Sequence, residues 1–133
     1  MKYILTNSDL EKMIAEEILA NNNLIGLDSD EVQKLKENSD FIDGTAVNGK
    51  LDNLGKLADE ALSQIMEAHP NNQLTMLMFK IRVSEKYDLT MEHINNFNDF
   101  FSDSKFDIPM MWGIETEGAI PDEVRLCVLC GFK

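Results

Sequence analysis

The chain has 133 residues, of which 44% are hydrophobic and 27% charged, as expected for one globular domain. Its 24 acidic and 12 basic residues give a formal net charge of −12 at pH 7. No basic patch is therefore expected to contact phosphates, which argues against nucleic acid and membrane surfaces as partners. The N-terminus does not resemble a signal peptide, and no apolar run approaches the ~18 residues of a spanning helix. We expect a cytoplasmic protein with reduced cysteines.

The N-terminal third of the sequence carries two helical patterns. Ser8 and Glu11 form a capping box ahead of the first helix, and Asp28 or Ser29 begins a shorter second one. The apolar residues expected on one face of the first helix are Leu10, Met13, Ile14, Ile18 and Leu19, and those of the second are Val32 and Leu35. Residues 2–6 predict an edge strand. Residues 38–49, NSDFIDGTAVNG, indicate a turn-rich connector without a regular period.

Two further helices are predicted in the rest of the chain. The clearer one ends at His69-Pro70, because proline disfavours helix at the residue before it. Its apolar stripe comprises Leu51, Leu54, Leu57, Ala58, Ala61, Leu62, Ile65 and Met66. The other spans about 90–101, with Asp88 as a cap. Its predicted inward residues are Met91, Ile94, Phe97 and Phe101.

Three strands alternate with these helices. The first, over 74–83, places Leu77, Phe79, Ile81 and Val83 on one face and Met76, Met78, Lys80 and Arg82 on the other. The predicted inward sets of the next two are Ile108, Met110, Trp112 and Ile114, then Val124, Leu126, Val128, Cys130 and Phe132. A hairpin-length loop, ETEGAIPD, joins those two strands.

This order of elements predicts an α+β fold with a small mixed β-sheet and helices packed mainly on one face. A strand–helix–strand unit gives a parallel pair with a right-handed crossover, and the closing hairpin adds an antiparallel strand. Residues 1–43 form a helical N-terminal extension that packs on the same domain, and residues 44–133 form the α+β domain itself. The sheet face lined by Met76, Met78, Cys127 and Leu129 requires a cover, from the N-terminal helices or from a partner.

The cysteines and histidines do not form a recognisable chemical site. Cys127 and Cys130 make a C-x-x-C, but in a strand residues three apart point to opposite faces, so we expect two core thiols. His69 lies at a helix C-terminus, where a partial positive charge is favourable. His93 falls near the polar side of a helix, where we expect a solvated side chain. Neither has a nearby serine, cysteine or acid in sequence that would make a triad.

The remaining candidates are carboxylates and methionines. Residues 28–31, DSDE, begin like a calcium loop but lack its glycine and continue as helix. Asp40 and Asp43 lie in a turn-rich stretch, where aspartate commonly forms turns. Met76, Met78, Met110 and Met111 suit a core, and also an adaptable binding surface. No glycine-rich phosphate loop occurs, so we assign no catalytic, cofactor or metal residue.

Two stretches, YDLTMEHINNFNDFF and DIPMMWGIETEGAIPDEVRLCVLCGF, resemble the C-terminal domain of FtsZ, the bacterial tubulin-like cell-division protein. The matching positions are Asp88, Leu89, Thr90, Met91, Gly113, Asp122, Glu123, Val124, Arg125, Leu126, Val128, Gly131 and Phe132. A looser likeness in GTAVNGKLDNLGKLADEAL extends the match over 44–132. The resemblance implies a small mixed sheet flanked by helices. The family's nucleotide-binding domain, with its G-G-G-T-G-[ST]-G signature, is missing.

NSDFID, with Asp40 and Asp43, is similar to the FtsZ synergy loop N-x-D-F-A-D, whose aspartates complete GTP hydrolysis on the neighbouring subunit. In the family a longer stretch separates that loop from the glycine-containing segment, whereas here GTAV follows at once.

Three hypotheses follow. In the first, the chain is a stand-alone, non-catalytic protein-interaction module whose partner is an FtsZ-like GTPase or a second copy of itself. In the second, it is a small ligand-binding or enzymatic α+β domain that uses the Met-lined sheet face as its pocket. In the third, Asp40 and Asp43 act on a partner's GTP.

Overall fold

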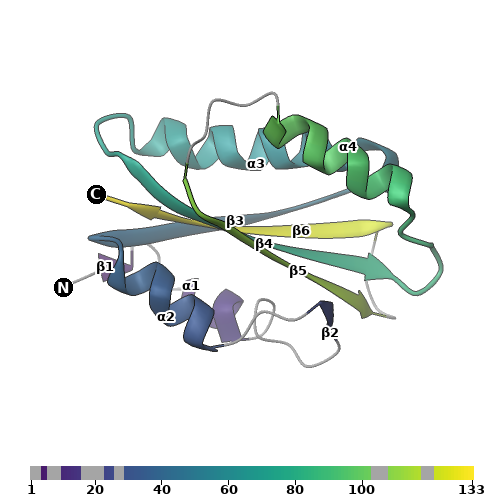
Figure 1. Cartoon of the computed structure of the whole chain (residues 1–133), viewed down its shortest axis with the longest axis horizontal. Helices are drawn as coiled ribbons and strands as arrows, with labels where there is room; N and C mark the ends of the chain where they lie inside the picture. Colours follow the sequence, from purple (N-terminus) through teal and green to yellow (C-terminus); the bar gives the residue numbers. More distant parts are fainter. Residues whose placement is uncertain (1–3, 6–9, 16–22, 26–28, 103–107, 118–121) are drawn as a thin grey trace.

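A mixed β-sheet separates two helical layers (Figure 1). The computed structural model describes residues 4–5, 10–15, 23–25, 29–102, 108–117 and 122–133. Its elements are β1 (Ile4–Leu5), α1 (Leu10–Met13), β2 (Asn23–Ile25), α2 (Ser29–Glu37), β3 (Phe41–Gly49), the 3₁₀ turn η2 (Leu51–Asn53), α3 (Leu54–Ala68), β4 (Leu74–Ser84), α4 (Met91–Ser102), β5 (Met110–Glu117) and β6 (Val124–Phe132). The described strands form one sheet in the order β1-β3-β6-β4-β5-β2. None of the helices in these ranges has the length and apolarity needed to cross a bilayer.

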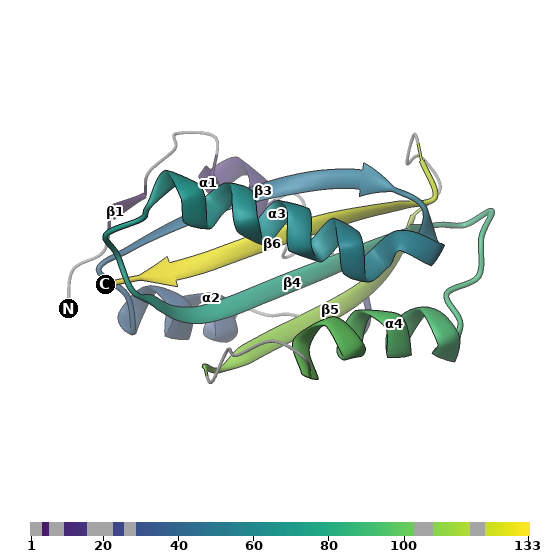
Figure 2. The ribbon, with the colours of Figure 1, turned by 90° about the horizontal axis from the view of Figure 1, so that it is seen from above.

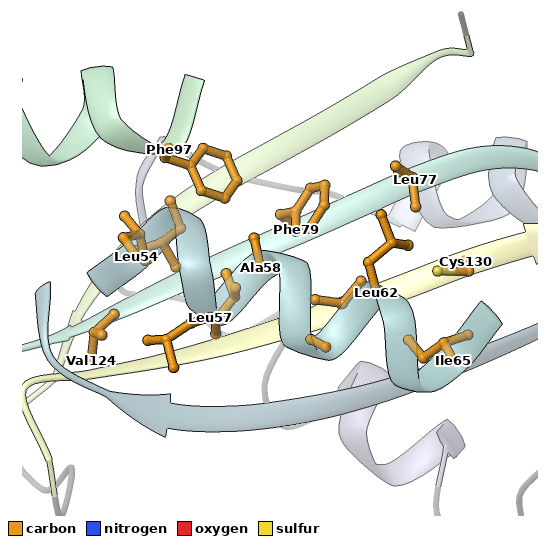
Figure 3. Close-up of a cluster of buried hydrophobic side chains, with 14 of the residues drawn as sticks. Leu54, Leu57, Ala58, Leu62, Ile65, Leu77, Phe79, Phe97, Val124 and Cys130 are labelled. Carbon is orange, nitrogen blue, oxygen red and sulfur yellow. The ribbon is translucent and has the colours of Figure 1, made fainter. Parts of the chain in front are cut away.

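Helices α3 and α4 cover one face of this sheet and form the larger core cluster. Every 3.6 residues α3 returns an apolar side chain to the sheet, and Leu54, Ala58 and Leu62 are buried there. Figure 3 shows these residues over Phe79 and Cys130 of the sheet. Phe97 of α4 packs against Phe79 in a T-shaped ring contact with centroids 5.3 Å apart. The predicted stripe of α3 and the predicted alternation of β4 and β6 are confirmed.

The opposite face is covered by the N-terminal helices, which pack on the Met-lined side of the sheet (Figure 1). This second cluster joins Leu10, Ile14, Val32 and Leu35 to Ile42, Met76, Met78, Cys127 and Leu129. The chain therefore supplies its own cover for that face. Of the first predicted helix, Ser8, Ile18 and Leu19 lie outside the described residues, as does Asp28 before α2.

The prediction of a turn-rich connector over 38–49 is wrong, because Phe41–Gly49 forms β3. This strand pairs with β6 in antiparallel register along its whole length, from Phe41↔Phe132 to Gly49↔Val124. Phe41 and Val47 contact the first cluster, whereas Ile42 and Ala46 contact the second. Since both faces are partly apolar and two glycines interrupt them, no alternation is visible in the sequence. The strand also runs across the boundary between residues 43 and 44 that separates the two predicted parts of the chain.

The predicted closing hairpin is also wrong in its pairing. β4 and β5 are parallel, as predicted for a strand–helix–strand unit. β6 is antiparallel, but it lies between β3 and β4 and does not pair with β5 (Figure 2). A central position explains why all but one of the residues of β6 are buried.

Two predicted inward methionines are in fact exposed. Met91 in the first turn of α4 is 68% exposed, and Met110 at the start of β5 is 40% exposed. The cap of α4 also differs from the prediction. The Thr90 hydroxyl, and not Asp88, accepts a hydrogen bond from the His93 amide at 3.4 Å.

Candidate functional site

Cys127 and Cys130 lie on opposite faces of β6, as the strand period predicts. Cys127 is buried in the cluster under α1 and α2, and Cys130 in the cluster under α3. Both thiols are free. Burial, reinforced by the nearby Asp43 carboxylate, holds the pKa of Cys130 well above its usual range. This thiol is therefore unsuited to nucleophilic or redox chemistry.

His69 and Asp43 form a polar pair that the sequence did not reveal. His69 Nε2 lies 2.8 Å from Asp43 Oδ2, and each side chain is 18% exposed. The imidazole packs against both Phe41 and Phe132, with ring centroids 5.0 and 4.9 Å away, and the two phenyl rings also stack on each other. His69 also closes α3, where its amide bonds the carbonyl of residue 66. The pair joins the end of α3 to the start of β3.

Both carboxylate oxygens of Asp43 are hydrogen-bonded within the chain. Its second carboxylate oxygen accepts the amide of Gly44 at 2.8 Å. Asp40, by contrast, is exposed, and its amide donates to the carbonyl of Phe132 at 2.8 Å. The structure thus places the two aspartates of the third hypothesis in different settings. Asp43 is directed at His69, and of the two aspartates only Asp40 is solvent-exposed.

A second histidine pair connects α4 to the turn before α3. His93 Nε2 lies 3.1 Å from Asp52 Oδ1, while its Nδ1 accepts the amide of Thr90 at 3.0 Å. The prediction that His93 is a solvated side chain is corrected, since its side chain is only 16% exposed. Both ring nitrogens serve to position helices.

A buried ion cluster lies on the Met-lined side of the sheet, at the end where the strands β4 and β5 finish. Glu115 Oε2 is 3.5 Å from both Lys80 Nζ and Arg82 Nε. Lys80 is fully buried and Glu115 is 3% exposed. Burial lowers the pKa of Lys80, and the Glu115 carboxylate opposes that shift. The alternation of residues along β4 predicts that Lys80 and Arg82 lie on this face, but it does not predict that Glu115 is their partner.

A hollow lined largely by polar and acidic residues lies between α3 and α4, on the side of these helices that faces away from the sheet. Its lining residues are Asp52, Asn53, Gly55, Lys56, Asp59, Asn96 and Asp99. Gly55 brings the helices close together, because its amide donates to the Asn96 side chain at 3.0 Å. In the described ranges, no group of three or more histidine, cysteine or acidic side chains could hold a metal ion. The hollow has no further feature that would define a ligand.

The chain matches no protein-family model, and no curated protein matches it at a significant level. Solved structures do match. An FtsZ mutant from M. jannaschii aligns over 92% of this chain and 37% of its own, with a TM-score of 0.66 and 15% identity. An empty FtsZ dimer from M. jannaschii aligns over 92% of this chain and 36% of its own, with a TM-score of 0.56 and 18% identity.

A thiamine-monophosphate kinase from Stenotrophomonas maltophilia K279a aligns at a TM-score of only 0.48. The chain spans little more than a third of the FtsZ chains that it resembles. At these identities the likeness concerns the fold. The protein has an α+β fold with a small mixed sheet like that of the FtsZ C-terminal domain.

Proposed function

We propose that this chain is a non-catalytic protein-interaction module with an FtsZ C-terminal-like fold, acting in the cytoplasm. Its partner is a tubulin-like GTPase or a second copy of the chain, and cell division is the process that the resemblance implies. The fold likeness and the missing glycine-rich nucleotide signature support this proposal. Because fold alone does not fix function, the proposal also depends on how the side chains of the sheet are buried.

The observation that carries the proposal is that the Met-lined sheet face is filled by the chain's own side chains. Met78 and Leu129 are fully buried there, beneath Leu35 of α2. A ligand-binding domain that used this face would need an open apolar pocket with convergent polar groups. The self-covered face therefore favours contact through the molecule's outer surface over a ligand pocket.

The test is co-sedimentation with the FtsZ-type GTPase of the same organism, assembled with GTP. We expect the chain to pellet with the polymer in proportion to its concentration and to change the light scattering of assembly. An unrelated acidic protein of similar size, which should remain in the supernatant, controls for trapping. A chain that stays in solution, with assembly unchanged, would contradict the GTPase arm of the proposal.

The same mixture tests whether the two aspartates act on a partner's nucleotide. Because both carboxylate oxygens of Asp43 are bonded within the chain, we expect Asp40→Asn with Asp43→Asn to leave GTP turnover unchanged. Asp59→Asn on the exposed side of α3 serves as the matched control. Turnover that falls only in the double variant would show that these carboxylates act in trans.

A further inference from the structure

Among the residues that the structure describes, the outer edge of β3 has a strand partner only at its first two residues. β1 pairs with Phe41 and Ile42 alone, and no described strand pairs with the outer side of residues 43–49. Figure 2 shows the end of this strand along the margin of the sheet. Folded proteins usually block such an edge with lysine, proline or a bulge. Residues 43–49, DGTAVNG, contain no lysine or proline, and their register with β6 is uninterrupted.

The hydrogen bonds of the sheet show which backbone groups of β3 point outward. The Leu77 amide donates to the carbonyl of Pro109 before β5, so odd-numbered residues of β4 bond towards β5 and even-numbered ones towards β6. The even-numbered residues of β4 lie opposite odd-numbered residues of β6, as in the pair Lys80↔Cys127. The backbone N–H and C=O groups of odd-numbered β6 residues therefore bond to β4, and those of even-numbered β6 residues bond to β3. Even residues of β6 face odd residues of β3. The N–H and C=O groups of Gly44, Ala46 and Asn48 therefore point away from the sheet.

We propose that two copies of this chain associate through β3, whose open edges pair in antiparallel register about a two-fold axis at Ala46. In that register Ala46 lies opposite Ala46 of the second copy, and Gly44 lies opposite Asn48. Ala46 then exchanges its N–H and C=O with its opposite, and the Asn48 N–H donates to the Gly44 carbonyl of the second copy. The Gly44 N–H donates to Asp43 within its own chain and takes no part in the pairing. The inference rests on the self-association arm of the proposed function and specifies its surface.

The side chains of this edge are complementary to themselves in that register. Thr45 lies opposite Val47, a pairing of β-branched residues that suits a sheet. Asp43, the one charge in the segment, lies opposite Gly49, and its carboxylate is held by His69 and Gly44 of its own copy. The paired segment also ends where β1 begins to pair, at Ile42. Neither like charges nor another described strand oppose the pairing.

The net charge of −12 on each copy predicts an unusual response to salt. Two acidic chains repel one another, and salt screens that repulsion over about 10 Å at 0.1 M. A single strand pair is also smaller than a standard interface, so the dimer is weak and forms at high protein concentration. Sedimentation velocity of the full chain should show a mass that doubles with concentration. The midpoint should fall to lower protein concentration as NaCl is raised, and a monomer throughout overturns the proposal.

Two substitutions at one position separate this edge from other interfaces. Ala46→Pro removes an outward N–H and no bond to β6, a position where an edge strand accepts proline. We expect it to remain monomeric at every concentration. Ala46→Ser keeps the N–H and should dimerise like the natural chain. A dimer of the proline variant that matches the natural one overturns the proposal.

Hydrogen exchange on the natural chain gives a readout that does not depend on any variant folding. The amides of Ala46 and Asn48 should gain protection as the protein is concentrated, whereas those of Thr45 and Val47, already bonded to β6, should be protected throughout. A dimeric sample in which the amides of Ala46 and Asn48 exchange freely overturns the proposal. These measurements use the chain alone, so an absent dimer does not bear on whether the chain binds the GTPase. Co-sedimentation of the monomeric Ala46→Pro variant with the GTPase tests that binding separately.

Discussion

At the scale of single residues, Cys130 gives the chain a defined response to pH. Burial and Asp43 raise its folded-state pKa above the ordinary value of 9.0, so above pH 9.0 the unfolded chain ionises while the folded chain does not. The folded state then binds more protons, and stability falls as pH rises. We expect the unfolding free energy of the natural chain to fall relative to Cys130→Ala above pH 9.0, by at most about 1.4 kcal/mol per pH unit.

The measurement for Cys130 is urea unfolding of both proteins from pH 6 to pH 10. The cavity left by alanine produces a constant offset below pH 8, which serves as the internal control. An offset that stays constant up to pH 10 would show that the thiol ionises in the folded protein. Ellman's reagent should agree with the first outcome, labelling the thiols only after denaturation.

A single carboxylate oxygen of Glu115 forms ion pairs with both Lys80 and Arg82. Glu115→Gln keeps the shape but removes the carboxylate from beside buried Lys80 and Arg82. Loss of one member of a buried ion pair costs about 3 kcal/mol of stability. Lys80→Met combined with Glu115→Gln should recover part of this loss, because one of the buried cations is then gone. Urea unfolding at pH 7 measures both variants.

The pH dependence of that variant has a definite sign. Burial places the folded-state pKa of Lys80 below 10.5, so as pH approaches 10.5 the folded chain releases its proton before the unfolded chain does. The unfolded state then binds more protons, and stability rises with pH. Glu115→Gln lowers the pKa of Lys80 further, because the Glu115 contribution raises it. The stability deficit of the variant should therefore shrink between pH 7 and pH 9.5, and a constant deficit would contradict this account.

At the scale of elements, the contact between α3 and α4 depends on a glycine. A Cβ at position 55 would lie 2.9 Å from the backbone carbonyl oxygen of Asn96, too close for either helix to stay in place. We expect Gly55→Ala to destabilise the fold by about 2 kcal/mol, as overpacking does, although alanine is the better helix former. Ser63→Ala on the exposed side of α3 is the control. Equal stability of the two variants would show that the helices are not in close contact.

The elements that the sequence predicts correctly carry a long apolar signal. α3 repeats an apolar residue every 3.6 positions, and β4 and β6 are apolar along most of their length, so the positions of Leu62, Leu77 and Leu126 follow. β3 does not follow, because its short apolar stretch at Phe41 and Ile42 is succeeded by DGT. Its assignment depends on pairing with β6, a tertiary interaction that no local pattern encodes.

In the candidate sites, too, the local sequence pattern predicts which way a side chain points but not its distant partner. The opposed cysteines follow from strand period alone. The pairs His69–Asp43 and Lys80–Glu115 do not, since each joins residues far apart in sequence. Predicting them would require the order of strands, and the sequence placed β6 beside the wrong neighbour. Sequence alternation therefore identified which face Lys80 occupies but not its partner.

At the scale of the whole molecule, the two core clusters share one sheet. β6 contributes Val128 and Cys130 to one cluster and Cys127 and Leu129 to the other. Side chains on opposite faces of one strand cannot lose their order independently, because loss of the strand exposes both. The N-terminal helices should therefore unfold together with the rest of the chain, although sequence alone treats residues 1–43 as an extension.

Leu35→Ala tests this coupling between the two faces. Leu35 is fully buried under the Met-lined face, and its truncation should lower the unfolding free energy by about 3 kcal/mol. The only tryptophan, Trp112, packs against the other cluster and reports on it. Urea midpoints from Trp112 fluorescence and from far-ultraviolet circular dichroism should shift together, and Lys34→Ala, at an exposed neighbouring position, should shift neither. If the Trp112 midpoint stayed unchanged while helical signal was lost earlier, residues 1–43 would unfold as a separate unit and their cover over the methionines would be removable by a partner.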